Sequence, residues 1–199
     1  MSVFTDKMDA FEERFENVVL QKSKISKSDF EDCTFVGCDL SESQFSSCRF
    51  IRCRFENCNL SLLKLPNTQF SDVEFIECKM IGIDWTKCDW QSRLEVEPMR
   101  FRGSLLNDSS FFGLSIPNTV MKECRIKEVD FRQAKLQNAN FSHSDMEGAL
   151  FWDTHLENAD FSGCENLLLD MRTCHLKGAK MGRYDALAMM SSLGIVLVD

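Results

Sequence analysis

The sequence predicts an all-β solenoid whose backbone winds in coils of twenty residues. Large apolar residues recur every five positions from Phe15 to Trp90, and similar residue types recur every twenty positions. An α-helix repeats every 3.6 residues and a half-buried strand every two, so neither explains a spacing of five. A fixed internal period indicates a repeat architecture. We therefore expect one elongated repeat domain over residues 15–181.

Each five-residue block has a large apolar residue at its centre and, in most blocks, a small residue two positions earlier. Over residues 33–60 the small residues are Cys or Ser, and the centres are Phe35, Leu40, Phe45, Phe50, Phe55 and Leu60. A backbone that returns after four blocks would stack residues twenty apart at one strand spacing, about 4.8 Å. The centres are then expected to form ladders of like side chains inside the solenoid.

Two stretches interrupt this rhythm. Residues 91–105, QSRLEVEPMRFRGSL, carry both charge signs together with Pro98 and Gly103, which are breaker signals. The centres then resume one residue out of phase, with Phe101 already in the new phase, so we expect an inserted loop at 91–100. Farther on, in SGCENLLLDM, the polar Asn166 stands where a large apolar residue is due, and the rhythm recovers at Met171.

Residues 1–14 are expected to cap the first coil. Phe4, Met8, Phe11 and Phe15 are spaced by four, three and four residues, a spacing that favours a short amphipathic helix. Repeat arrays need such atypical ends to cover their exposed core.

Residues 182–199 are expected to form a short helix followed by an extended tail. Asp185 is a plausible N-cap, the helix should run to about Leu193, and Gly194 should end it. The last residues, IVLVD, are apolar. An exposed apolar tail requires a covering surface, either the last coil or another subunit.

Composition and charge exclude several classes of protein. The chain has 199 residues, 44% of them hydrophobic, and a formal net charge of −8. This charge opposes nonspecific binding to nucleic acid, which needs clustered Lys and Arg. The start, MSVFTDKMDAFEERF, lacks the basic and apolar regions of a secretory signal. No apolar run approaches the roughly 18 residues of a membrane helix. We expect a cytoplasmic protein that contacts neither membrane nor nucleic acid directly.

The cysteines and histidines do not form a recognisable catalytic or metal motif. Cys33 and Cys38 are five residues apart, wider than the usual zinc-knuckle spacing, and lie at the small position of their blocks, where Cys acts as an apolar filler. His143, His155 and His175 occupy separate blocks with no nucleophile signature nearby. We expect no catalytic residue, metal or cofactor, and hence no enzyme.

Tandem blocks of the form A-[D/N]-[L/F]-x-x resemble the pentapeptide-repeat family across residues 15–181. This resemblance implies a right-handed quadrilateral β-helix with four repeats per coil, about eight coils and a length of roughly 40 Å. The tail DALAMMSSLGIVLVD is similar to that of members that bind DNA gyrase and dimerise tail to tail. The stretches FEDCTF, ECKMIGIDW, LNDSSFFGL and ECRI resemble the albicidin-resistance type within the family.

The resemblance implies a homodimer that mimics DNA, binds DNA gyrase or topoisomerase IV, and protects it from an albicidin-like or quinolone-like poison. Antibiotic resistance or self-immunity would follow. Two other interpretations stay open. The first is an interaction or effector scaffold with a non-gyrase target, which an aromatic or basic surface stripe together with no affinity for gyrase would favour. The second is a metal- or redox-linked protein that uses the cysteines.

Three groups of residues are candidates for contacts with partners. The carboxylates expected to form an anionic surface are Asp29, Glu31, Asp39, Glu56, Asp84 and Asp89. The candidates in the partner-binding loop are Arg93, Leu94, Glu95, Val96, Glu97 and Arg100. The dimer candidates are Leu187, Met190, Leu193, Ile195, Val196 and Val198.

Overall fold

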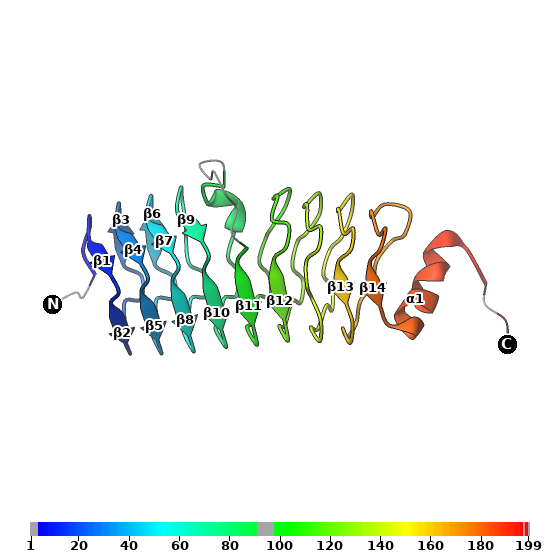
Figure 1. Ribbon diagram of the computed structural model, residues 1–199, viewed down its shortest axis with the longest axis horizontal. Helices are drawn as coiled ribbons and strands as arrows, with labels where there is room; N and C mark the ends of the chain where they lie inside the picture. Colours follow the sequence, from blue (N-terminus) through cyan, green and yellow to red (C-terminus); the bar gives the residue numbers. More distant parts are fainter. Residues whose placement is uncertain (1–3, 91–97, 197, 199) are drawn as a thin grey trace.

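The computed structural model describes residues 4–90, 98–196 and 198. These residues form a parallel β-solenoid of about eight coils with a short helix at its C-terminal end. Figure 1 shows the coils succeeding one another along the long axis of the molecule, with the two termini at opposite ends. The all-β repeat architecture expected from the period of five is confirmed. No helix among the described residues has the length and apolar character needed to cross a membrane.

The strands are short because each side of a coil holds one five-residue block. In chain order the elements are β1 (Asp9–Phe11), β2 (Arg14–Glu16), β3 (Lys24–Ser26), β4 (Asp29–Glu31), β5 (Thr34–Val36), β6 (Gln44–Ser46), β7 (Arg49–Ile51), β8 (Arg54–Glu56), β9 (Gln69–Ser71), β10 (Glu74–Ile76), η1 (Trp85–Lys87), β11 (Arg100–Arg102), β12 (Val120–Lys122), β13 (Asp160–Phe161), β14 (Lys180–Met181), α1 (Arg183–Met189) and η2 (Met190–Leu193).

Strand pairing follows the period of twenty. Four sheets run along the molecule, in the orders β1-β4-β7-β9, β12-β11-β10-β8-β5-β2, β13-β14 and β3-β6. Phe15 pairs with Phe35 and Phe35 with Phe55, all in parallel register. Isolated bridges such as Asp145↔Glu165 continue the same columns between strands. Outside the first interruption, paired residues therefore lie twenty positions apart in the sequence.

The first interruption adds six residues to one coil and leaves the columns aligned. Phe75 pairs with Phe101, an offset of 26 residues, and Phe101 pairs with Met121, an offset of twenty. Because six is one more than a multiple of five, the phase shift expected from the sequence is confirmed. Val96 and the other residues of 91–97 lie outside the described residues.

The core is a set of apolar ladders that follow these columns. Phe35 and Phe55 stack with ring centroids 4.4 Å apart and planes 5° apart, and Phe30 and Phe50 stack at 4.9 Å. Neighbouring ladders meet edge to face, as in the Phe30–Phe35 pair at 5.7 Å. Offset and edge-to-face contacts are the favourable geometries of aromatic rings. This close packing of phenyl rings suits the strong preference of the sequence for Phe over Tyr.

Where the residue two before a centre is Cys, Ser or Thr, its side chain can donate a hydrogen bond as well as fill space. The thiols of Cys38 and Cys58 donate to the carbonyl oxygens of Phe15 and Phe35, one coil earlier, both at 3.4 Å. The hydroxyl of Thr68 donates in the same way to the carbonyl oxygen of Phe45 at 2.8 Å. Cys, Ser and Thr therefore share this position because each is compact and carries a donor.

The corner of most blocks is made by a residue with positive φ, two positions after the centre. This residue is Gly37 in one block, but it is Lys22 in another and Leu62 in a third, with φ between 55° and 62°. A side chain in this left-handed region costs roughly 1–2 kcal/mol. The regular coil geometry imposes this conformation on residue types that rarely adopt it.

The N-terminal segment differs from the expected helix. Residues Asp9–Phe11 and Arg14–Glu16 are strands, Ala10 is buried at a centre position, and Phe11 is 57% exposed. The rhythm of five thus begins before Phe15, and the apolar spacing of 1–14 was too short to specify a helix. Phe4 closes the end of the core, with its ring 4.8 Å from that of Phe15.

The second interruption of the rhythm is confined to one five-residue block. The irregular residue Asn166 has φ 54° and is exposed, while Leu167 and Leu169 are buried. The column register of twenty residues continues through this region, as the His155↔His175 bridge shows. Leu167, one position later, supplies the buried apolar side chain that the five-residue rhythm predicts at position 166.

The C-terminal helix closes the other end of the core. Its N-cap is Gly182, without a side-chain hydrogen bond, so the expectation that Asp185 is the N-cap was wrong; Asp185 lies in the first turn. Met189 is 1% exposed and packs against the core. Gly194, with φ 73°, ends the helical segment as expected, and the Ile195 N–H donates to the Met190 carbonyl at 3.3 Å, a typical C-terminal closure.

Candidate binding surfaces

Three of the six carboxylates of the expected anionic surface, Asp29, Glu31 and Glu56, are paired with arginines. Arg49 donates two hydrogen bonds to Asp29, through Nε at 2.8 Å and through Nη2. Arg52 binds Glu31 and, at 2.8 Å, Asp32. The hydrogen bond from Arg49 lowers the pKa of Asp29 despite partial burial. These acidic groups lie on the surface as expected, but their charge is compensated by residues in the next coil.

The remaining carboxylates of this group also have partners. Glu56 pairs with Arg54 at 2.5 Å. Asp39 accepts hydrogen bonds from Ser41 and Gln21, which outweigh its desolvation and lower its pKa. Asp84 accepts from the Thr86 backbone at 3.0 Å and caps η1, with Lys87 at 3.6 Å. Asp89 accepts from Gln69 at 2.8 Å. Cationic side chains therefore pair with four of these six carboxylates, while Asp39 and Asp89 accept hydrogen bonds from neutral side chains.

The expected partner-binding loop is only partly within the described residues. Arg93, Leu94, Glu95, Val96 and Glu97 lie outside them. Arg100 lies in strand β11 and not in a loop, and its guanidinium pairs with Asp72 at 2.6 Å. Its position in a strand follows from the early return of the five-residue rhythm at Phe101.

A groove lies beside η1, the last element before the interruption. Its apolar lining includes Leu62, which is 52% exposed, together with Leu63 and Pro66. Lys64 and Asp84 contribute charged groups to its lining. The groove also includes a residue of η1, which directly precedes the interruption in the sequence.

A stripe of alternating aromatic and arginine residues occupies one outward column of the C-terminal half. We call it the Phe–Arg–Trp stripe, and its members are Phe112, Arg132, Trp152 and Arg172, each twenty residues from the next. The Arg132 guanidinium lies 5.7 Å from the centroid of the Phe112 ring, within cation–π range. Asp130 holds Arg132 through two hydrogen bonds of 2.9 and 2.8 Å. This stripe was not among the predicted features, although the period of twenty places its four members in one column.

The structure also brings together two histidines that the sequence analysis treated as separate. His155 and His175 face each other from adjacent coils, with ring centroids 4.2 Å apart, and Glu157 lies beside them. The third histidine, His143, is exposed at a positive-φ corner elsewhere. Among the described residues, His155, Glu157 and His175 form a group that could hold a metal ion.

The ten cysteines are all buried. Burial raises the pKa of Cys53 and of Cys124 to about 12. A thiol with a raised pKa is largely protonated at neutral pH and is a poor nucleophile and metal ligand. The positions of the cysteines thus agree with a filling and hydrogen-bonding role inside the coils.

The dimer candidates cluster at the C-terminal end of the rod. Leu187 and Met190 are partly buried, whereas Leu193 and Ile195 are 47% and 42% exposed. The tail residues Val196 and Val198 are 84% and 89% exposed. The apolar surface that the sequence led us to expect is therefore present at this end.

Comparison with known proteins identifies the repeat. The family model of the pentapeptide repeat region matches residues 28–97 and 95–161. Two solved structures of trypsin-treated variants of QnrB1, a plasmid-mediated fluoroquinolone resistance protein, match with TM-scores of 0.56 and 0.55 at 21% and 22% identity. Each match covers 98% of this chain and 99% of that chain. A comparison with curated proteins gives no match.

The likeness to QnrB1, at this identity, shows the fold. It does not choose between the quinolone-resistance type and the albicidin-resistance type that the sequence favours. The family model, however, covers more than half of the chain, and its repeat is the one that builds the coils described above. The chain belongs to the pentapeptide-repeat family.

Proposed function

We propose that the protein binds DNA gyrase, or the related topoisomerase IV, and protects it from a poison, so conferring antibiotic resistance or self-immunity. The supporting observation is the end-to-end match with a fluoroquinolone resistance protein, which extends over 98% of this chain and includes its C-terminal helix. A β-solenoid filled by stacked phenyl rings is an interaction scaffold and not a catalytic fold. Its outer surface is the part available for a partner.

The protein acts as a mimic of DNA chiefly through its shape. A straight rod fits a surface that normally receives a duplex, and its outward carboxylates take the place of phosphates. Pairs such as Arg49–Asp29 and Arg52–Asp32 reduce the net field of this surface. Binding to gyrase should accordingly fall less steeply with salt than DNA binding does, because fewer counterions are released.

The interruption before β11 and the groove beside η1 form the contact that disturbs the poisoned enzyme. Irregular segments on a rigid scaffold commonly carry function. The groove offers apolar surface at Leu62 and Pro66 beside charged Lys64. The loop candidates Arg93, Glu95 and Glu97 follow η1 directly in the chain. Contacts from both features would position the rod on its target.

A second copy of the chain covers the C-terminal tail. Leu193, Val196 and Val198 expose apolar side chains beyond α1. An apolar tail of this kind is stabilised when a partner removes it from water. We propose a tail-to-tail homodimer, in which two rods are joined end to end.

The decisive experiment is a gyrase supercoiling assay with the purified protein. We expect the protein to restore supercoiling in the presence of albicidin or a fluoroquinolone and to reduce drug-stabilised DNA cleavage. The triple variant R93A/E95A/E97A should lose this protection while keeping its fold by circular dichroism. Failure of the wild-type protein to bind gyrase or to change the effect of either drug would refute the proposal.

The Phe–Arg–Trp stripe favours a second candidate function, an interaction scaffold with a non-gyrase target. Trp152 is 52% exposed and Phe112 43% exposed, and aromatic and arginine side chains are enriched at interface hot spots. The W152A variant separates the two functions. If the stripe serves a non-gyrase target, W152A should keep full gyrase protection, whereas loss of gyrase protection in W152A would assign the stripe to gyrase binding and refute the second function.

A further inference from the structure

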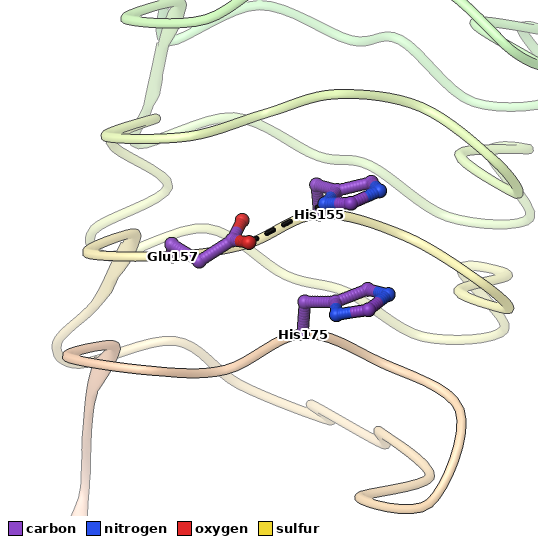
Figure 2. A group of neighbouring side chains, drawn as sticks. All are labelled: His155, Glu157 and His175. Atoms are coloured by element: carbon purple, nitrogen blue, oxygen red, sulfur yellow. Dashed lines mark hydrogen bonds and ion pairs between the residues drawn. The ribbon is translucent and has the colours of Figure 1, made fainter.

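The geometry of three side chains near the C-terminal end of the solenoid points to a metal site. Figure 2 shows His155 and His175 one above the other on successive coils, with the Glu157 carboxylate to one side. His155 and His175 are parallel bridge partners, so the backbone fixes their separation. One ligand atom from each of the three residues lies within 4.8 Å of the others. We propose that these residues bind a divalent transition metal ion such as Zn²⁺, independently of the proposed gyrase function.

The chemistry of the group suits this class of ion. Two imidazoles and a carboxylate are a common ligand set for zinc when a fourth position is left to water. Imidazole ligands also suit Ni²⁺ and Cu²⁺, whereas Mg²⁺ and Ca²⁺ prefer sites made only of oxygen atoms. The two rings and the single carboxylate therefore favour a transition metal ion over an alkaline-earth ion.

The carboxylate of Glu157 is positioned for a ligand role. Its Oε1 atom lies 3.3 Å from His155 Nδ1. Its Oε2 atom is buried and has no hydrogen-bond partner among the described residues. A buried, unpaired carboxylate oxygen is costly, and a bound cation would satisfy it.

Asp153 supplies an outer contact to the second histidine. Its Oδ1 atom lies 3.8 Å from Nε2 of His175, which leaves Nδ1 of that ring for the ion. In Figure 2 one nitrogen of each ring is on the side of Glu157. Metal-ligating histidines usually direct their second nitrogen to a carboxylate, which fixes the orientation of the ring. Asp153 is therefore a positioning residue in this site.

To bind one ion, the three ligand side chains must move slightly closer together. The two rings are parallel within 4°, whereas ligands around tetrahedral zinc, with bonds of about 2.0–2.1 Å, are roughly 3.3 Å apart. The rings must tilt toward a common point. Both side chains are partly exposed, at 34% and 50%, so they can turn without disturbing the core.

An ion held here would join two successive coils next to the irregular block at Asn166. Binding to the folded state alone stabilises that state, by an amount that grows with the concentration of the free ion. The effect should be local to the last coils, because the ligands come only from them. The bound ion would thus cross-link successive coils at the C-terminal end of the rod.

The test is titration of the full-length, tag-free protein with Zn²⁺ by calorimetry and with Co²⁺ by absorption spectroscopy. We expect saturable binding of one ion per chain. The variants H155Q and H175Q should each weaken binding by about 100-fold, E157Q by at least about tenfold, and D153N by about tenfold, as for other outer contacts to metal ligands. The matched control is H143Q, which removes the remaining histidine and should leave the affinity unchanged.

Two further measurements complete the test. Zn²⁺ should slow proteolysis within residues 160–180 in the wild type and in H143Q, but not in H175Q. The Co²⁺ spectrum should lack a sulfur-to-metal charge-transfer band, which the buried cysteines would produce if they bound the ion. Absence of saturable binding, equal affinity in wild type and H175Q, or a thiolate band would each overturn the proposal.

Discussion

Arg49 and Asp29, twenty residues apart in the sequence, face each other across adjacent coils and form an ion pair with two hydrogen bonds. The pair shows that residues twenty positions apart contact each other on the outer surface of the solenoid as well as in its core. Charges of opposite sign one coil apart cancel locally, and the rod is less anionic at this position than its carboxylates suggest.

Replacing Arg49 should change the titration of Asp29. In R49M the pKa of Asp29 should rise toward its ordinary value of about 3.9, which NMR titration can measure. A carboxyl group whose pKa is depressed on folding stabilises the protein above its unfolded pKa, and this contribution is lost as the pH falls through the folded pKa. The difference in stability between wild type and R49M should therefore be present at pH 7 and vanish at strongly acidic pH.

Because this pair is exposed, its contribution at pH 7 should be below about 1 kcal/mol. The control is R125M, which removes an exposed arginine that makes no ion pair with a described residue. A constant difference between R49M and wild type from pH 7 to pH 2 would contradict the assignment of the shift to this pair.

Removing one ring from the middle of the phenyl ladder should lower the stability of the protein. Phe55 is 2% exposed and stacks on Phe35 at 4.4 Å and on Phe75 at 5.1 Å. F55A should lower the free energy of unfolding by about 3–5 kcal/mol, the usual cost of removing a buried ring, measured by urea denaturation. The control F112A removes an exposed ring and should cost far less. Similar losses for the two variants would contradict the ladder as the main source of stability.

The positive-φ corners offer a way to stabilise the rod. Leu62 has φ 58° and is about half exposed. L62G should increase the melting temperature, because glycine relieves roughly 1–2 kcal/mol of backbone strain, although its greater freedom in the unfolded chain offsets part of this gain.

The reverse substitution provides the matched control. Gly113 has φ 66°, and a Cβ there would meet no atom within 4 Å. G113A should therefore lower the melting temperature through backbone strain alone. If L62G destabilised the protein as much as G113A did, conformational strain at the corners would not be the controlling factor.

The cysteines should be unreactive in the native protein. All ten are buried, and several donate hydrogen bonds to carbonyl oxygens of the preceding coil. A thiol-specific reagent should label them slowly in buffer and completely in denaturant. C58S, which retains a donor to Phe35, should be more stable than C58A. Rapid native labelling would revive a redox role for the cysteine column.

The C-terminal tail should control the oligomeric state. L193S/V196S places hydroxyl groups on the exposed apolar surface beyond α1 and should convert the proposed dimer into a monomer, as measured by light scattering. The control Y184S changes a side chain that is 84% exposed on α1 and should preserve the dimer. Deletion of residues 184–199 should give monomers or aggregates, and an intact soluble dimer after deletion would refute this interface.

The interior of the solenoid could be predicted from the sequence because position in the period decides burial. Phe35, Phe55 and Phe75 are identical residues twenty apart, and they form the ladder that this spacing predicts. The phase shift after Trp90 likewise indicated an insertion whose length is one more than a multiple of five. Near the two ends of the chain, local sequence patterns predicted the secondary structure less well. The first residues join the coils instead of forming a helix, and Gly182 caps α1 in place of Asp185.

The outer surface was less predictable because its contacts depend on rotamers as well as on register. The period of twenty places Asp29 beside Arg49, but the sequence does not say that their side chains meet. The same period places His155 beside His175 and Phe112 beside Arg132, and applying it to outward positions would have found both pairs. Their partners Glu157 and Asp130 lie only two residues away in the chain.

The continuity of the columns across the 26-residue coil has a consequence for how such a protein can change in length. Phe75, Phe101 and Met121 remain in one column although the coil between the first two is six residues longer. The six additional residues do not displace the later coils. The rod can therefore be lengthened or shortened only in whole coils, while segments of any size can be grafted at a corner. The length of the rod and the segments inserted at its corners can therefore change independently of each other, for example by recombination.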